Sequence, residues 1–204
     1  MAHRHVAVTA AVVLAIGGAV AGVLAAQGGG PDRAFRGSPP PAGIRLPAFA
    51  LPDDSGGRVS SARLQGKVVL VTFLDTQCRE ACPLIAGHVG RALSLLPDDL
   101  RGDVVALAIS TDPAEDTPEA VDEFLRRHRV RGRLRYLVAP ESEMRAVWSA
   151  FAVLPSLDTG DDDTHSAPVR IYDRRGEWVS TQHAGADLTP ENLAHDLRLA
   201  VESE

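Results

Sequence analysis

Two cysteines close together are the residues of this sequence with the most chemical potential. Cys78 and Cys82 are the only cysteines of the chain; Arg79-Glu80-Ala81 separates them, and Pro83 follows. Three intervening residues let both side chains turn toward one point, where two sulfur atoms can form a disulfide, exchange one with another protein, or hold a soft metal ion. Pro83 suits the first turn of a helix, and the N-terminus of a helix stabilises a thiolate. The spacing therefore predicts a reactive or metal-binding pair.

A purely structural role is the alternative interpretation of the pair. The two cysteines could form a stabilising disulfide, or they could be small buried apolar side chains, as free cysteines often are. A cross-link over three residues removes little chain entropy, so a disulfide here would stabilise the fold only slightly. The pair also lies where a predicted strand ends and a helix begins, which is the ligand-binding end of an α/β sheet. We therefore favour reactivity over structure.

The hydrophobic pattern around the pair predicts strands that alternate with helices. Residues 68–74 read VVLVTFL, a continuous apolar run typical of a strand buried on both faces. Strands that alternate with helices form a parallel sheet, and the hairpin formed by strands 169–172 and 177–181 adds antiparallel strands at one edge. We predict an α/β fold with helices flanking a mixed sheet, compatible with a thioredoxin-like fold. The predicted elements are an N-terminal β-hairpin within 46–60, strands 68–74, 104–110, 134–139, 169–172 and 177–181, and helices 83–96, 118–129, 142–151 and 190–201.

The first part of the chain, residues 1–27, is predicted to be a transmembrane anchor or an export signal. Residues 6–26 carry no charge, and at about 1.5 Å rise per residue they just cross a hydrocarbon core of about 30 Å. The run is longer than the apolar core of an ordinary signal peptide, which favours an uncleaved single-pass helix. Residues 28–45 are rich in glycine and proline and are predicted to be a flexible linker, so the folded domain is expected to span 46–204.

Composition excludes some classes of function. The chain is 45% hydrophobic and 24% charged, as expected for a folded domain. Its formal net charge of -6 gives no basic surface for phosphates, so we expect no nucleic-acid partner. Two cysteines are too few for a disulfide scaffold, so a hydrophobic core must hold the fold.

Three stretches together give the sequence a specific resemblance. They are Cys78-Arg79-Glu80-Ala81-Cys82-Pro83, Ser110-Thr111-Asp112-Pro113-Ala114-Glu115-Asp116-Thr117-Pro118, and Asp163-Thr164-His165-Ser166. In this combination they resemble the Sco/SenC family, membrane-anchored copper proteins of the cytochrome c oxidase assembly pathway. The likeness runs from about residue 46 to the C-terminal helix. It implies a thioredoxin-like domain on the extracytoplasmic side of the cell membrane.

The resemblance also implies a copper site and a function. Carried over motif by motif, the copper ligands are Cys78, Cys82 and the distant His165, and the ion is Cu(I) or Cu(II). The implied function is that of a metallochaperone, which delivers copper to the dinuclear copper site of cytochrome c oxidase or matures that site. The implied partners are the copper-bearing subunit of the oxidase and other copper chaperones or thioredoxin-like reductants.

The position of His165 in the predicted fold agrees with this ligand set. His165 precedes strand 169–172, and in a sheet of this type the entry to that strand lies beside the cysteine loop. The spacing from Pro168 to the turn residue Gly176 resembles that of the cis-proline of thioredoxins, so we predict a cis bond between Ala167 and Pro168. The other histidines of the domain are interpreted as surface, hairpin or helix residues: His88, His128, His183 and His195.

Two positions depart from the family's usual pattern. Arg79 stands where the family usually has proline, and Thr164 separates Asp163 from His165, although the family often has aspartate directly before its histidine. Neither change removes a ligand atom. Arg79 does place a cation beside the thiolates, which favours redox chemistry or a different docking partner.

The same cysteines are also compatible with a second function. The protein could be a membrane-anchored thiol-disulfide oxidoreductase that reduces partner cysteines, with Cys78, the more exposed thiol, attacking and Cys82 resolving the mixed disulfide. A peroxide-scavenging protein of the same fold is a third interpretation. His165 discriminates between the first two functions, because metal binding requires it and dithiol exchange does not.

Overall fold

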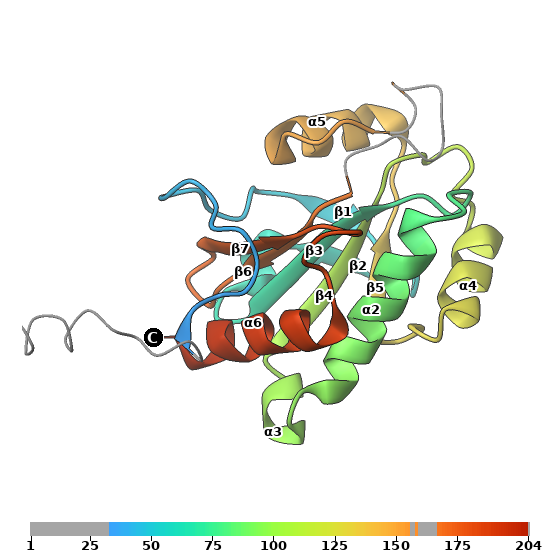
Figure 1. Ribbon diagram of the computed structural model, residues 1–204. Coiled ribbons are helices and arrows are strands. Elements are labelled where there is room, and N and C mark those ends of the chain that lie inside the picture. Colours follow the sequence, from blue (N-terminus) through green and yellow to red (C-terminus); the bar gives the residue numbers. More distant parts are fainter. Residues whose placement is uncertain (1–32, 156–157, 159–166, 204) are drawn as a thin grey trace, which may run out of the picture. The chain divides into compact units, whose positions relative to one another are not determined.

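A five-stranded mixed sheet forms the centre of the fold (Figure 1). The structure is a computed structural model that describes residues 33–155, 158 and 167–203. The strand order is β5-β4-β3-β6-β7, with β3, β4 and β5 parallel and β6 and β7 antiparallel to their neighbours. This arrangement confirms the predicted mixed sheet. The strands are β3 (Val68–Leu74), β4 (Val104–Ser110), β5 (Leu134–Leu137), β6 (Val169–Tyr172) and β7 (Trp178–Gln182).

Helices cover both faces of the sheet, as predicted (Figure 1). All residues of β3 are buried, because one core cluster packs on each of its faces. The first cluster includes apolar residues of α2 (Ala81–Leu95), α4 (Pro118–Arg127) and α6 (Pro190–Glu202). The second includes those of α5 (Glu141–Phe151). A short helix that we did not predict, α3 (Asp98–Arg101), precedes β4.

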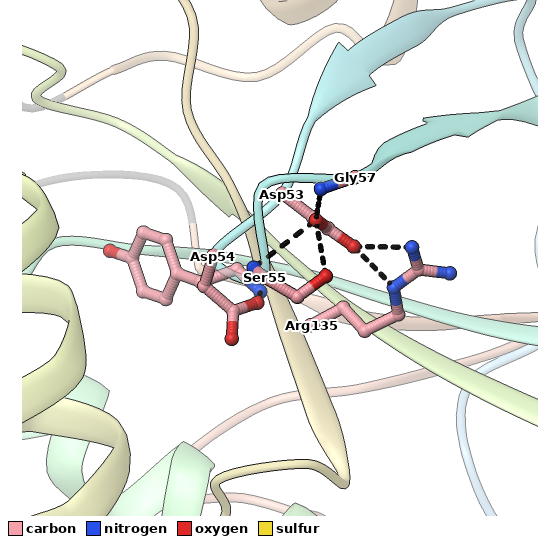
Figure 2. A network of polar contacts seen from close by, with 6 residues as sticks. Asp53, Asp54, Ser55, Gly57 and Arg135 are labelled. Atoms are coloured by element: carbon pink, nitrogen blue, oxygen red, sulfur yellow. Dashed lines mark hydrogen bonds and ion pairs between the residues drawn. The ribbon is translucent and has the colours of Figure 1, made fainter.

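The predicted N-terminal hairpin is present and is fastened to one edge of the sheet. It consists of β1 (Ala50–Pro52) and β2 (Arg58–Ser60), and a 3-10 turn, η2 (Ser61–Leu64), follows. In its turn the Asp53 carboxylate accepts hydrogen bonds from the Gly57 N–H at 2.7 Å and the Ser55 hydroxyl at 2.8 Å, and it pairs with Arg135 of β5 (Figure 2). Burial alone would raise the pKa of Asp53, but these donors lower it below its ordinary value.

The opposite edge of the sheet is covered by the segment that precedes the hairpin. Ser38 and Arg45 form isolated bridges with residues of the β7 hairpin, Thr181 and Glu177. The N–H of Gly37 donates to the carboxylate of Asp196 in α6 at 3.0 Å. Residues 35–45 are therefore part of the compact unit that contains the sheet. The reason is that Asp196 is fully buried and needs these backbone donors.

The predicted membrane segment lies outside the described residues. Residues 1–27 fall within the part of the chain that is not described. Within the described ranges, every helix is too short or too polar to cross a bilayer.

Candidate metal centre

The two cysteines lie at the carboxyl end of β3, as predicted. The loop 75–80 joins β3 to α2, and α2 begins at Ala81, so Cys82 lies in the first turn of the helix. The two cysteines are not joined by a disulfide, and both are buried: Cys78 is 3% exposed and Cys82 0%. The backbone N–H of Cys82 donates to Sγ of Cys78 at 3.3 Å. The side chains therefore converge, and an N–H at the helix N-terminus points at one of the two sulfur atoms.

The two thiols differ in their chemistry. The pKa of Cys82 is raised well above its ordinary value, first by its hydrogen bond with Cys78 and then by burial. A negative charge on Cys78 raises the pKa of Cys82 further. In the pair, therefore, Cys82 is a thiol that holds its proton more strongly than an ordinary cysteine does.

Cys78 is also the thiol that the solvent reaches. It lines a groove between the cysteine loop and α4, together with Arg79, Phe124, Arg127 and other residues of the two segments. Cys82 does not line this groove and is completely buried. The predicted order of exposure is confirmed, although both thiols are more buried than a reactive surface cysteine would be.

Asp116, a residue that we did not predict to have a role, holds the cysteine loop in place from another segment of the chain. Asp116, between β4 and α4, is 2% exposed, and its Oδ1 accepts the N–H of Thr76 at 2.8 Å. Its Oδ2 accepts the hydroxyl of Ser110 at 2.6 Å and that of Tyr136 at 2.9 Å. Burial raises the pKa of Asp116 to about 6, although these hydrogen bonds lower it in part. Asp116 lies in one of the quoted motifs, but nothing in its spacing indicates a buried carboxylate.

The described part of the chain leaves the predicted third ligand untested. His165 lies outside the described residues. The neighbourhood in which we expected it is present, because Val71 of β3 pairs with Arg170 of β6 and the entry to β6 therefore lies beside the end of β3. Ala167, just before that strand, packs against the core cluster that contains both cysteines.

The predicted cis bond before Pro168 is wrong. The described residues contain no cis peptide bond. Pro168 directly precedes β6, where a proline needs no N–H partner in the sheet, and the trans form is the more stable one by about 0.5 to 1 kcal/mol.

Two of the other histidines of the domain have defined surroundings. His88 Nδ1 lies 3.1 Å from the carbonyl oxygen of Leu188. His128, which we interpreted as a solvated helix end, is half-buried beside Phe124 and lines the same groove as Cys78. Burial and the neighbouring Arg127 lower its pKa. Across residues 33–155, 158 and 167–203, no group of three or more His, Cys, Asp or Glu side chains is arranged to hold a metal ion.

Comparisons with known proteins agree with the fold and the motif. The family model described as SCO1/SenC matches residues 40–202. A SCO2-like protein of Rickettsia typhi is 26% identical over 157 residues, which cover 74% of this chain and 75% of the relative.

Two solved structures extend the comparison. The ScoI protein of Bradyrhizobium japonicum, solved with copper bound, is 30% identical, has a TM-score of 0.63, and is matched over 76% of this chain and 98% of its own. BsSco, described as a member of the Sco family of cytochrome c oxidase assembly proteins, is 21% identical with a TM-score of 0.65. The match covers 82% of this chain and 99% of BsSco, and at this identity it shows the fold alone.

Proposed function

The chain belongs to the SCO1/SenC family, and from this membership we propose that it binds copper as a metallochaperone of cytochrome c oxidase assembly. The observation that carries the proposal is the pair of reduced, converging thiols at the ligand-binding end of the sheet. A relative of 30% identity, the ScoI protein of Bradyrhizobium japonicum, has been solved with copper bound. Thiolates are the ligands that Cu(I) prefers, so the donors fit the cargo.

The proposed ligands are Cys78, Cys82 and His165. Copper is the cargo of the protein, and it would reach the pair from the groove on which Cys78 opens. Cys78 would bind first because it lines the groove, and Cys82, whose pKa is raised, would lose its proton as copper arrives. The groove also gives a partner's thiolates access to bound copper, so transfer can proceed by ligand exchange.

The proposed setting is the extracytoplasmic side of the cell membrane. Residues 1–27 would anchor the chain as a single helix. The proposed partner is the copper-bearing subunit of cytochrome c oxidase, with other copper chaperones or thioredoxin-like reductants supplying copper or electrons. This assignment rests on the membership of the chain in the SCO1/SenC family.

Anaerobic titration of Cu(I) into the reduced full-length chain tests the proposal. We expect one tightly bound equivalent, and we expect Cys78→Ser, Cys82→Ser and His165→Ala each to weaken binding strongly. The matched control is His128→Ala, because His128 lines the same groove but is not a proposed ligand. Binding by His165→Ala that equals binding by the parent would remove His165 from the ligand set.

A thiol-disulfide oxidoreductase is the second candidate function. The observation in its favour is that Cys78 and Cys82 are joined by a hydrogen bond and not by a disulfide, which is the reduced form of a redox pair. This function needs both cysteines and does not need His165. Robust disulfide reductase activity in His165→Ala, together with unchanged copper binding, would replace the first function by the second.

A further inference from the structure

The cysteine loop is tied to the sheet through one buried carboxylate. Thr76, two residues before Cys78, donates its N–H to Asp116 across a sequence separation of 40 residues. Asp116 is itself fixed by the Ser110 hydroxyl of β4 and the Tyr136 hydroxyl of β5. The neighbouring Gln77 N–H bonds only within the loop, to Asp75 at 2.7 Å. Asp116 thus joins the loop to the edge strand β5 and to its neighbour β4.

The burial of Asp116 is costly, which makes a role in the site the better explanation than packing. A carboxylate that is 2% exposed loses most of its hydration, and no cation of the described chain is paired with it. Its hydrogen bonds offset this cost only in part, because burial still raises its pKa. An apolar side chain of similar size would fill the space at lower cost but would leave the Thr76 N–H without an acceptor.

We propose that Asp116 is a positioning residue of the thiol pair: by accepting the Thr76 N–H it holds the loop so that Cys78 meets Cys82 and opens on the groove. The hydrogen bond performs this function, and the charge is not required. Asparagine at position 116 keeps a carbonyl oxygen for Thr76, and its amide can donate to the Ser110 and Tyr136 hydroxyls, which accept as well as donate. Alanine at this position removes the acceptor.

Alkylation of Cys78 in the metal-free, reduced full-length chain tests the proposal. Iodoacetamide is the probe, and peptide mass mapping reads the rate at Cys78 under conditions where the chain stays folded. We expect Asp116→Ala to raise the rate about tenfold or more, because it leaves the Thr76 N–H without an acceptor and so favours opening of the loop. We expect Asp116→Asn to stay within about twofold of the parent, because it keeps that acceptor.

Ser110→Ala is the matched control, because it removes a different hydrogen bond of the same carboxylate and leaves the Thr76 N–H paired. We expect its alkylation rate to stay near that of the parent. An unchanged rate in Asp116→Ala overturns the proposal. An equal acceleration in Asp116→Asn or in Ser110→Ala also overturns it, since the effect would then reflect lost charge or lost stability.

Hydrogen exchange in the unaltered chain tests the same idea if Asp116→Ala does not fold. The opening of the loop that exposes Cys78 must also break the Thr76 hydrogen bond. The factor by which hydrogen exchange at the Thr76 amide is slowed relative to an unfolded chain should therefore agree, within about threefold, with the factor by which alkylation of Cys78 is slowed. Free exchange at Thr76 with Cys78 still protected would refute the coupling.

The inference deepens the proposed function, and its copper measurement rests on that function. Asp116→Ala should weaken Cu(I) binding about tenfold, and Asp116→Asn should restore it. A parent chain that binds no copper would end the proposed function, but the alkylation and exchange experiments would still decide the role of Asp116.

Discussion

The pH dependence of stability should change in a defined way when Asp116 is replaced by asparagine. Burial raises the pKa of Asp116 from its ordinary value of 3.8 to about 6. The folded chain therefore holds this proton at pH values where the unfolded chain has released it. The stability that the protonated carboxyl contributes is complete below pH 3.8 and is lost as pH rises through about 6.

The size of the effect follows from the shift. The pKa of Asp116 rises by about two units on folding, and each unit corresponds to 1.36 kcal/mol. The free energy of unfolding should therefore fall by about 3 kcal/mol as pH rises from below 3.8 to above about 6. Asp116→Asn has no such proton, so its stability relative to the parent should rise by about 3 kcal/mol from about pH 4 to about pH 7. All other titrating groups are common to both chains and cancel in the difference.

Urea unfolding across this pH range measures the difference. Asp53→Asn is a suitable control, because the pKa of Asp53 is lowered and its contribution is lost only as pH falls below 3.8. The stability of Asp53→Asn relative to the parent should not change between about pH 4 and about pH 7, the range in which that of Asp116→Asn rises. A pH-independent difference for Asp116→Asn would refute the assignment of a raised pKa to this buried carboxyl.

Three further predictions concern the proposed copper site and helix α2. Because the raised pKa of Cys82 keeps its thiol protonated at neutral pH, Cu(I) affinity should rise with pH by up to about tenfold per unit, measured by competition with a chelator. Gly87→Ala should stabilise the fold by about 0.5 to 1 kcal/mol in urea unfolding, since a Cβ there meets no atom within 4 Å. Gly90→Ala should destabilise it by about 1 to 2 kcal/mol, since a Cβ there lies 2.6 Å from Cγ1 of the buried Val130.

The sequence was most informative where one local rule decided the structure. Residues 68–74 and 104–110 became strands with the predicted bounds, because a continuous β-branched run can only be buried between two layers. Helix α4 begins at Pro118 as predicted, and the hydroxyl of Thr117 before it accepts the Ala120 N–H. The cysteine loop followed from these elements, since it must join a buried strand to a helix.

Features that depend on contacts between distant segments could not be predicted in this way. The docking of residues 35–45 depends on a buried acceptor in α6, Asp196, which lies far along the chain. Asp116 resembles any aspartate of a polar loop until β4 and β5 bring Ser110 and Tyr136 against it. The trans bond before Pro168 likewise shows that spacing borrowed from another family does not determine a local conformation.

Both outer strands of the sheet are shielded, and this limits the ways in which another chain can join it. The hairpin turn bonds to β5 through the Asp54 N–H and the Tyr136 carbonyl, and the segment 38–45 bridges to the β7 hairpin. Exposed strand edges are templates for a further strand, and covering them suppresses self-association into extended sheets. It also disfavours recognition by strand addition. A partner must then bind through loops and side chains, and the loop that carries Cys78 is one of the loops available for this.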